Sequence, residues 1–223
     1  MNVASLLVAL TILLVGLLGD ASSSSGGNVC FKPSGYKLRL LYFSMRYRAE
    51  FIKWMLHYAD VQYEEVTISG EDWAATEKAK QPYGMLPVLE VNGRKLTQSL
   101  AVARAVAKLT RLDFRRCGDD FDRATLDMHA YSFLDFISAI DKRGLTSAMV
   151  FKPDEARVKE IANELENKLT WLDFYVAEWL GRLEEKLTPS LLDKFPALRD
   201  HSHRVKSLPA LQGYLKSRPD API

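Results

Sequence analysis

The side chains that most often perform chemistry are sparse in this chain of 223 residues. Its two cysteines, Cys30 and Cys117, are too few for a disulfide scaffold or a four-cysteine zinc site, and neither belongs to a Cys-x-x-Cys pair. His201 and His203 lie two residues apart in a polar stretch, where histidines are more often solvated than metal-bound. Tyr42 ends an apolar run, and its hydroxyl can donate a hydrogen bond to an anion, although an aromatic residue there is by itself more often part of a core.

The overall composition excludes several classes of protein. Lys and Arg total 30 against 28 Asp and Glu, so the formal charge of +2 gives no support to a nucleic-acid-binding or polybasic membrane surface. Apolar residues make up 48% and charged residues 26%, which indicates a folded globular chain rather than a disordered one. The length suits one large domain or two small ones with a sizeable core.

The N-terminal segment is expected to lie outside the fold. Residues 3–19 carry no charge and are followed by small residues up to Gly27. This pattern predicts a signal peptide over residues 1–21, cleaved near Ala21, and then a linker over 22–35. An uncleaved membrane anchor is the alternative, so the protein is expected to be secreted or lumenal, and attached to a membrane only if the leader is kept. An oxidising compartment would permit a disulfide, but the pairing of the cysteines is not predictable.

The elements that must position any site begin after the linker. In chain order they are a strand over 36–43, a helix over 46–60, a strand over 61–68, a hairpin of two strands over 86–96 and a helix over 98–109. Asn92-Gly93 predicts the hairpin, because this pair favours a two-residue type I′ turn. The order β-α-β and then β-β-α indicates a thioredoxin-like α/β domain with a mixed sheet, over residues 36–113.

The remainder of the chain has a different pattern. No strand signal survives beyond residue 119, so we expect an all-α domain over 119–220, with the boundary near 110–120. Pro196 and Pro209 separate helices in its last part.

Several segments resemble the glutathione transferases, and most closely their sigma class, which includes the haematopoietic-type prostaglandin D synthases. They are YKLRLLYFSMRYRAEFIKWML, EDW, QPYGMLPVLEVNG, LTQSLAVARAVAK, LTWLDFYVAEWL and FPALRDHSHRVKSLPALQGYLKSRP. The resemblance covers roughly residues 36–220. It implies the glutathione transferase fold, which is a thioredoxin-like domain followed by an all-α domain, normally in a homodimer. It also implies glutathione as the co-substrate.

The resemblance gives the central role to Tyr42. Such enzymes lower the pKa of the glutathione thiol, which is about 8.5 when free, and each unit of depression needs about 1.4 kcal/mol of preferential thiolate stabilisation. Tyr42 matches the hydroxyl that stabilises the thiolate, and the N-terminus of the following helix adds a favourable dipole. Arg48 matches an arginine that supports this tyrosine electrostatically, and Ser44 is the second candidate for the thiolate donor.

Further matches concern the two ends of glutathione. Trp73 and Lys78 match residues that hold the glycine end, where a lysine pairs with the carboxylate. The chain carries one extra residue between Trp73 and the Pro-Tyr-Gly turn, so Lys80 is a less favoured substitute for Lys78. Gln98-Ser99 begins a helix whose N–H groups and hydroxyl suit the γ-glutamyl carboxylate.

The middle of glutathione is matched by Met85-Leu86-Pro87. The family has a cis proline at this turn, and the backbone of the preceding residue pairs with the cysteinyl backbone of glutathione. Asp135 matches an acidic residue that reaches the glutathione amino group of the neighbouring subunit, which requires a dimer.

The departures from the family pattern also carry information. Tyr47 stands where the family usually has glycine, and a phenol there would narrow the electrophile pocket or add a second hydroxyl to it. In the prostaglandin D synthases three neighbouring aspartates bind a divalent ion, but Tyr131 and Leu134 replace two of them here, so we expect no metal site. Lys142 stands near the place of the synthases' pocket tryptophan, which makes prostaglandin isomerisation less supported.

The largest departure precedes Thr170. Judged against usual family lengths, about 20 residues of the helical domain are missing before the Thr170–Asp173 box, whose spacing is that of a capping box. The loss could leave apolar surface uncovered, and a splice variant or gene-model error is the simplest explanation.

We therefore expect a glutathione transferase that conjugates glutathione to hydrophobic electrophiles or reduces lipid hydroperoxides. One alternative is a non-catalytic binder of haem, lipids or other hydrophobic ligands, and another is a glutathione-dependent prostaglandin D isomerase. A third is an unstable variant without a function of its own. The expected partners are glutathione, a hydrophobic small molecule and a second copy of the chain, with no nucleic acid.

Overall fold

The computed structural model describes residues 35–113, 120–143, 169–186, 191–194 and 196–219, which fall into two units. The first unit combines the described residues up to 113 with those from 207 onward, and the second lies within 120–206. The expectations for the leader, for most of the linker, for Cys30 and Cys117 and for the segment before Thr170 lie outside the described residues. Within the described ranges, no helix has the length and apolarity that a membrane span requires.

The first unit is built on a four-stranded mixed sheet. Its strands are β1 (Leu38–Phe43), β2 (Glu64–Ile68), β3 (Val88–Val91) and β4 (Arg94–Thr97). They lie in the order β2-β1-β3-β4, with β1 and β2 parallel and the other two pairings antiparallel. Asn92 and Gly93 join β3 to β4 with φ angles of 50° and 81°, as a type I′ turn requires. The predicted hairpin and thioredoxin-like sheet are confirmed.

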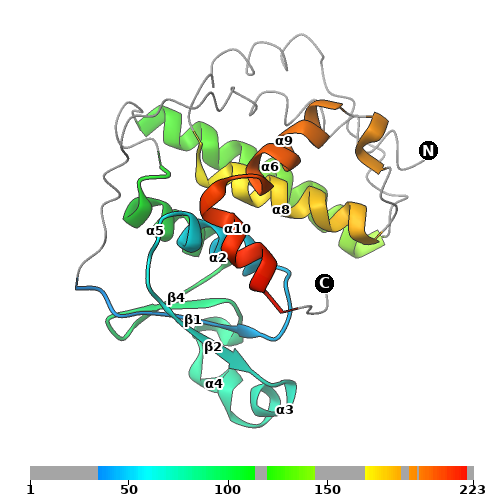
Figure 1. Cartoon of the computed structure of the whole chain (residues 1–223). Helices are drawn as coiled ribbons and strands as arrows, with labels where there is room; N and C mark the ends of the chain where they lie inside the picture. The colour runs from blue at the N-terminus through cyan, green and yellow to red at the C-terminus, as the bar shows by residue number, and fades with distance from the viewer. Residues whose placement is uncertain (1–34, 114–119, 144–168, 187–190, 195, 220–223) are drawn as a thin grey trace. The chain divides into compact units, whose positions relative to one another are not determined.

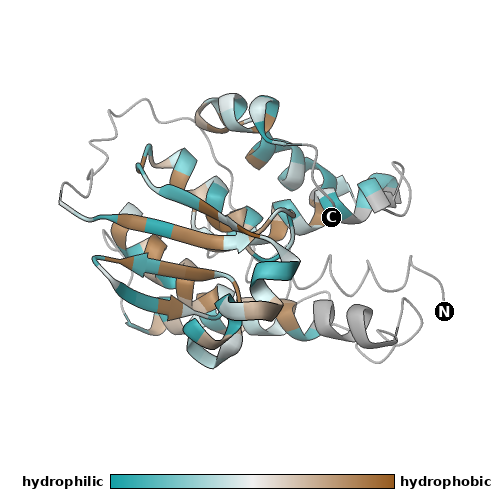
Figure 2. Cartoon of the chain, turned by 90° about the horizontal axis from the view of Figure 1, so that it is seen from below, coloured by the Kyte–Doolittle hydropathy of each residue, from teal (hydrophilic) through white to brown (hydrophobic). Residues whose placement is uncertain are grey.

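Three helices belong to one side of this sheet: α2 (Glu50–Tyr58), α5 (Ser99–Thr110) and α10 (Pro209–Ser217). Figure 1 shows them together, with α3 and α4 across the sheet from them. The apolar side chains of α2 are almost fully buried: Phe51, Ile52, Trp54, Met55 and Leu56. Successive residues of β1 point to opposite sides of the sheet, and the neighbours Leu40 and Leu41 are both buried, so both faces of this strand are covered. Figure 2 shows the apolar residues of the strands in brown.

A segment of short helical turns connects β2 to β3. It contains α3 (Gly70–Asp72), a π-helical turn η1 (Trp73–Glu77), α4 (Lys78–Lys80) and a 3₁₀ turn η2 (Pro82–Gly84). Ser69 begins it as an N-cap, since its hydroxyl accepts a hydrogen bond from the Asp72 N–H at 2.9 Å. The sequence predicts no element here, because each helical piece is shorter than the window in which periodicity can be recognised.

The described elements of the second unit are all helical. Its elements are α6 (Asp120–Arg143), α8 (Trp171–Lys186), η4 (Leu191–Lys194) and α9 (Pro196–Lys206). Phe133 of α6 is fully buried and meets the ring of Tyr175 edge-on, with centroids 5.1 Å apart. Pro196 and Pro209 are each the first residue of a helix, where the missing N–H costs no intrahelical bond.

The capping box before α8 is formed in part. The Asp173 carboxylate accepts hydrogen bonds from the Thr170 N–H at 2.7 Å and from the Thr170 hydroxyl at 2.9 Å. His201 of α9 lies 3.9 Å from the same carboxylate, from Nδ1 to Oδ1, and is only 1% exposed. The expectation of a solvated His201 is therefore wrong: α9 is amphipathic, and this position belongs to the face that packs on α8. His203 is exposed.

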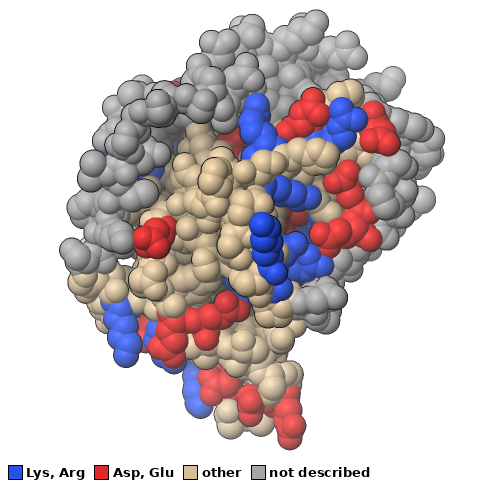
Figure 3. Space-filling view, in the orientation of Figure 1, with Lys and Arg blue, Asp and Glu red and all other residues tan. Residues whose placement is uncertain are grey.

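Charged side chains of both signs are intermingled on the face shown in Figure 3. Among the described residues, surface ion pairs join Arg39 to Glu64 at 3.0 Å and Arg123 to Asp120 at 2.6 Å. This arrangement agrees with the near-neutral charge and provides no broad basic surface on that face.

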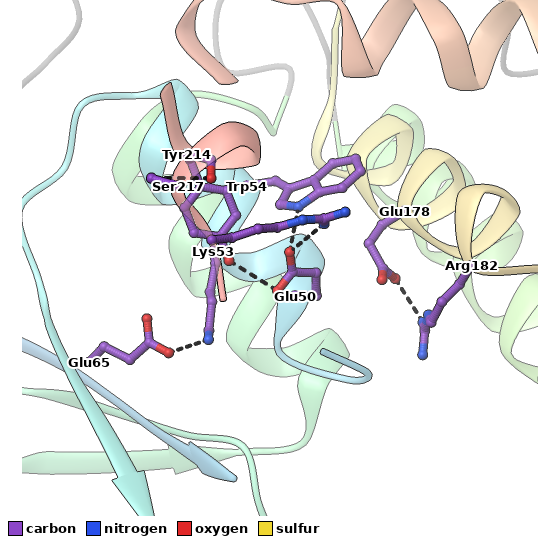
Figure 4. Close-up of polar contacts among 9 residues, drawn as sticks. Glu50, Lys53, Trp54, Glu65, Glu178, Arg182, Tyr214 and Ser217 are labelled. Atoms are coloured by element: carbon purple, nitrogen blue, oxygen red, sulfur yellow. Dashed lines mark hydrogen bonds and ion pairs between the residues drawn. The ribbon is translucent and has the colours of Figure 1, made fainter. Parts of the chain in front are cut away.

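Within the first unit, a buried carboxylate ties helix α10 to α2. Glu50 at the start of α2 is 1% exposed and accepts hydrogen bonds from Trp54 Nε1 at 3.0 Å and Tyr214 Oη at 3.0 Å (Figure 4). Arg218, just beyond α10, donates to Glu50 at 2.9 Å. The Tyr214 ring also stacks on His57 of α2, with centroids 4.2 Å apart. The expected helical domain extends to residue 220 in sequence, but these contacts show that its last helix packs on the thioredoxin-like unit.

Candidate functional site

The site starts at the end of β1, where Tyr42 is 5% exposed. Its hydroxyl oxygen accepts a hydrogen bond from the backbone N–H of Arg48 at 3.2 Å. This bond fixes the position of the phenol oxygen, and a hydroxyl that accepts a bond can also donate one through its own proton. Accepting from an amide also strengthens the hydroxyl as a donor, because linked hydrogen bonds polarise one another. The arrangement suits stabilisation of an anion at the strand end.

The loop between β1 and α2 orients the Arg48 N–H by an unusual backbone conformation. Tyr47 has φ of 65°, which is left-handed and costs energy for a bulky side chain, whereas glycine adopts it readily. The peptide that follows Tyr47 carries the Arg48 N–H, so this turn directs the N–H onto Tyr42. The Arg48 side chain is exposed, and its guanidinium carbon lies 5.6 Å from the Tyr47 ring centroid. Arg48 thus contacts Tyr42 through its backbone N–H.

Aromatic contacts connect Tyr42 to Trp73, which is expected to hold the glycine end of glutathione. Phe43 lies beside Tyr42, with ring centroids 5.8 Å apart, and meets Trp73 edge-on at 5.6 Å. Trp73 also packs against a buried cluster on the sheet formed by Leu41, Ile68 and Val88, together with Val66 and Leu86. The cluster fixes two of the expected glutathione contacts, Trp73 and Leu86, on the same face of the sheet.

The π-helical turn η1 accommodates the extra residue. The Lys78 N–H donates to the Trp73 carbonyl, five residues back. In an α-helix the residue four positions later lies above the first, and in a π turn the residue five positions later takes that place. Trp73 and Lys78 therefore share one helix face despite their longer spacing.

Ion pairing distinguishes the two lysines at this end. Lys80 Nζ lies 2.7 Å from the Glu77 carboxylate. Lys78 has no ion pair with any residue that the structure describes, and its side-chain stem runs along Gly84. The geometry thus leaves the Lys78 ammonium, rather than that of Lys80, to receive an external carboxylate.

The turn before β3 contains a cis peptide between Leu86 and Pro87. Met85 is half exposed and extended, and Leu86 is partly buried in the Trp73 cluster. Thr97 holds this turn, since its hydroxyl donates to the Pro87 carbonyl at 2.9 Å and lies 3.3 Å from the Met85 carbonyl. Thr97 was not predicted from the sequence, where its only signal is its position directly before Gln98.

The start of α5 forms the other end of the site. Gln98 is its N-cap, with φ of 72°, and its side-chain amide lies 3.4 Å from the sulfur of Met85. Ser99 is the first residue of the helix, so its N–H and those of the next residues point out of the helix end without intrahelical partners. Such a helix start attracts carboxylates.

Asp135 differs from the other expected contacts because it belongs to the second unit. It lies on α6 and is exposed, near the exposed Tyr131 and the partly buried Leu134. Its role, which requires a partner subunit, stays a prediction. Nowhere in the described ranges do three or more His, Cys, Asp or Glu side chains gather as a metal site would require. The side chain of Lys142 lies outside the described residues.

Comparison with known proteins identifies the family of the chain. The family model of the glutathione S-transferase N-terminal domain matches residues 38–108, and that of the C-terminal domain matches residues 164–218. Human hematopoietic prostaglandin D synthase is 32% identical over 204 residues, covering 83% of this chain and 98% of the synthase. The probable glutathione S-transferase 6 of Caenorhabditis elegans is 31% identical over 209 residues, with the same coverage.

Solved structures agree with these sequence matches. Monomeric Na-GST-3, from the human hookworm Necator americanus, superimposes with a TM-score of 0.69 at 28% identity, covering 84% of this chain and all of that one. Rat hPGDS complexed with a quinoline gives a TM-score of 0.65, also at 28% identity and with the same coverage. The thioredoxin-like sheet and the helical unit thus define the glutathione transferase fold, as expected. The chain belongs to the glutathione S-transferase family. Members of this family are enzymes whose co-substrate is glutathione.

Proposed function

We propose that this glutathione transferase uses Tyr42 to stabilise the glutathione thiolate for attack on hydrophobic electrophiles or lipid hydroperoxides. The observation that carries the proposal is the Tyr42 hydroxyl, buried at the end of β1 and held by the Arg48 N–H at 3.2 Å. In that position the phenol proton is donated to sulfur, which favours the thiolate and lowers the thiol pKa.

The chemical steps follow from the thiolate. In conjugation, sulfur forms a bond to the electrophilic carbon while the leaving group departs with its electron pair. With a hydroperoxide, sulfur attacks the terminal oxygen and the O–O bond breaks, giving an alcohol and the sulfenic acid of glutathione. A second glutathione then converts the sulfenic acid into the disulfide and water.

The proposed pose of glutathione uses the three parts of the first unit already described. The glycyl carboxylate pairs with Lys78 beside Trp73, and the cysteinyl backbone pairs with the backbone of Leu86. The γ-glutamyl carboxylate lies at the start of α5, against Ser99 and the free N–H groups there.

The sigma class, a homodimer and secretion are further parts of this proposal. The exposed apolar residues Phe121, Met128 and Tyr131 on α6 support a dimer, because they lie on the same helix as Asp135. One similar structure is described as monomeric, so the oligomeric state needs measurement by analytical ultracentrifugation. Secretion rests on the apolar N-terminal segment and is tested by N-terminal sequencing of the protein from cells.

Prostaglandin D isomerisation is the second candidate. It is supported by the 32% identity to human hematopoietic prostaglandin D synthase. Tyr131 and Leu134, in place of two aspartates, count against it.

The test is glutathione turnover with a panel of electrophiles, a lipid hydroperoxide and a prostaglandin endoperoxide, on wild type and Tyr42→Phe. We expect conjugation or peroxide reduction that falls by about 10- to 1,000-fold in the variant, with glutathione binding retained. Glutathione binding without any turnover would favour the ligand-binder alternative. Turnover of the endoperoxide alone would favour the isomerase.

A further inference from the structure

An open hollow lies beside the glycine end of the proposed glutathione site. It has a volume of about 430 Å³, within the range of small-ligand pockets. Its walls are Ala74, Ala75, Thr76, Lys78, Ala79, Gln81 and Gly84. They come from the π turn, from α4 and from the turn that leads to Met85, so the hollow adjoins the segments that hold glutathione.

The walls have two distinct chemical characters. The alanines of the helical segment present methyl groups, which suit an apolar occupant. Lys78 adds a cation that has no ion pair among the described residues, which suits a carboxylate. The hollow therefore matches a small group that combines an apolar side chain with a carboxylate.

Contacts around the hollow position two of its lining residues, Lys78 and Gln81. A Cβ atom on Gly84 would lie 3.3 Å from Lys78 Cγ, so the lysine stem runs close along this backbone. Gln81 is 6% exposed, and its amide oxygen accepts a hydrogen bond from Lys95 at 3.1 Å. The π turn contributes as well, because its extra residue adds a small side chain to this wall while Trp73 and Lys78 keep their shared face.

We infer that this hollow is a subsite for the third residue of a γ-glutamyl-cysteinyl peptide and accepts residues larger than glycine. The inference rests on the proposed glutathione pose, in which the glycyl carboxylate lies at Lys78. From that point an apolar side chain on the third residue extends over Ala75 and Ala79 rather than into a protein wall. The enzyme then uses thiol tripeptides of the type γ-glutamyl-cysteinyl-leucine as well as glutathione.

The experiment measures binding of glutathione and of γ-glutamyl-cysteinyl-leucine by calorimetry. The leucine peptide should bind wild type within about threefold of glutathione, because no wall rejects the extra methylenes. Ala75→Leu fills the hollow and should weaken binding of the leucine peptide by about tenfold or more. The affinity for glutathione should change less than about threefold. Leucine is a good helix former, so this exposed helical position should tolerate it.

Two further variants keep the result interpretable. Ala79→Leu fills the same hollow from α4 and replaces Ala75→Leu if that variant does not fold. Ala210→Leu makes the same change at an exposed position of α10 outside the hollow and should leave both peptides unaffected.

The outcomes separate the subsite from the enzyme function. If wild type binds glutathione but rejects the leucine peptide by about tenfold or more, the subsite is overturned and the transferase proposal stands. An equal loss of affinity for both peptides in Ala75→Leu also overturns the subsite. If wild type binds neither peptide, the proposed glutathione pose fails, and the subsite fails with it.

Discussion

The contact between Glu50 and the C-terminal helix gives a quantitative prediction about stability. Glu50 is 1% exposed and is held by Trp54, Tyr214 and Arg218. Glu50→Gln keeps the shape and much of the hydrogen bonding but removes the negative charge opposite the Arg218 guanidinium. The cost is therefore that of leaving a largely buried cation without its counter-charge.

The magnitude follows from the burial of the two partners. Removing one partner of a fully buried ion pair costs about 3–5 kcal/mol, and a hydrogen bond to a charged group contributes about 1.5–3 kcal/mol. The Arg218 side chain is 19% exposed and keeps some solvation. We therefore expect Glu50→Gln to lower the free energy of unfolding of the first unit by about 2–3 kcal/mol.

Urea denaturation measures the change without screening the charges. Glu64→Gln is the matched control, because Glu64 is 54% exposed in its pair with Arg39 and the loss should stay below about 1 kcal/mol. A double-mutant cycle with Arg218→Met should give a coupling energy with Glu50 of about 1.5 kcal/mol or more. A Glu50→Gln effect as small as that of the control would refute the claim that α10 is tied to α2 through this carboxylate.

Three other predictions test separate features. Tyr47→Gly should raise the free energy of unfolding by about 0.5–1 kcal/mol in urea, because glycine adopts the φ of 65° without strain; a loss of stability would show that the phenol makes a larger packing contribution. Burial lowers the pKa of His201 to about 3 and raises that of Asp173 to about 6. The neutral histidine thus contributes stability that is present above about pH 6.5 and lost as the pH falls, while Asp173 acts in the opposite direction between about pH 4 and 6. His201→Leu should therefore lose less stability than wild type between about pH 7 and 5 in urea titrations, and an unchanged pH dependence would contradict the assignment. Finally, Lys78→Met should weaken glutathione binding about tenfold in calorimetry and Lys80→Met less than about threefold, and the reverse order would move the carboxylate partner to Lys80.

The sheet of the first unit was predictable because its signals are local. Asn92-Gly93 specifies a turn that only two left-handed residues in succession can make, and the structure has that turn. The helix over 98–109 and the observed α5 differ by one residue at each end. These elements are encoded by patterns within a few neighbouring residues, so no knowledge of distant contacts was needed.

The π turn shows what the pattern alone does not provide. The sequence reveals one extra residue after Trp73, but not whether the backbone loops out or adds a wider helical turn. Packing of Trp73 on the sheet cluster and the hydrogen bond from Lys78 to its carbonyl identify the wider turn. Both contacts depend on tertiary structure, and the helical periodicity of about 3.6 residues in a sequence does not reveal tertiary contacts.

The wrong expectation for His201 and the unpredicted packing of α10 have the same cause. A polar helix sequence does not say which side faces a neighbour, and His201 is on the face that packs on α8. Likewise nothing near Tyr214 in sequence indicates that its hydroxyl bonds to Glu50, 164 residues away. Tyr47 could be recognised as a departure from glycine, but its cost appears only with the φ angle.

The pKa of the bound glutathione thiol tests the central claim most directly. The ultraviolet absorbance of the thiolate is titrated against pH in complexes of wild type and of Tyr42→Phe. The account predicts a thiol pKa in wild type at least about one unit below the free value of about 8.5, and a return toward that value in the variant with glutathione still bound. A thiol pKa near the free value in wild type, or one equally low in both proteins, would contradict the assignment of Tyr42 as the thiolate-stabilising residue.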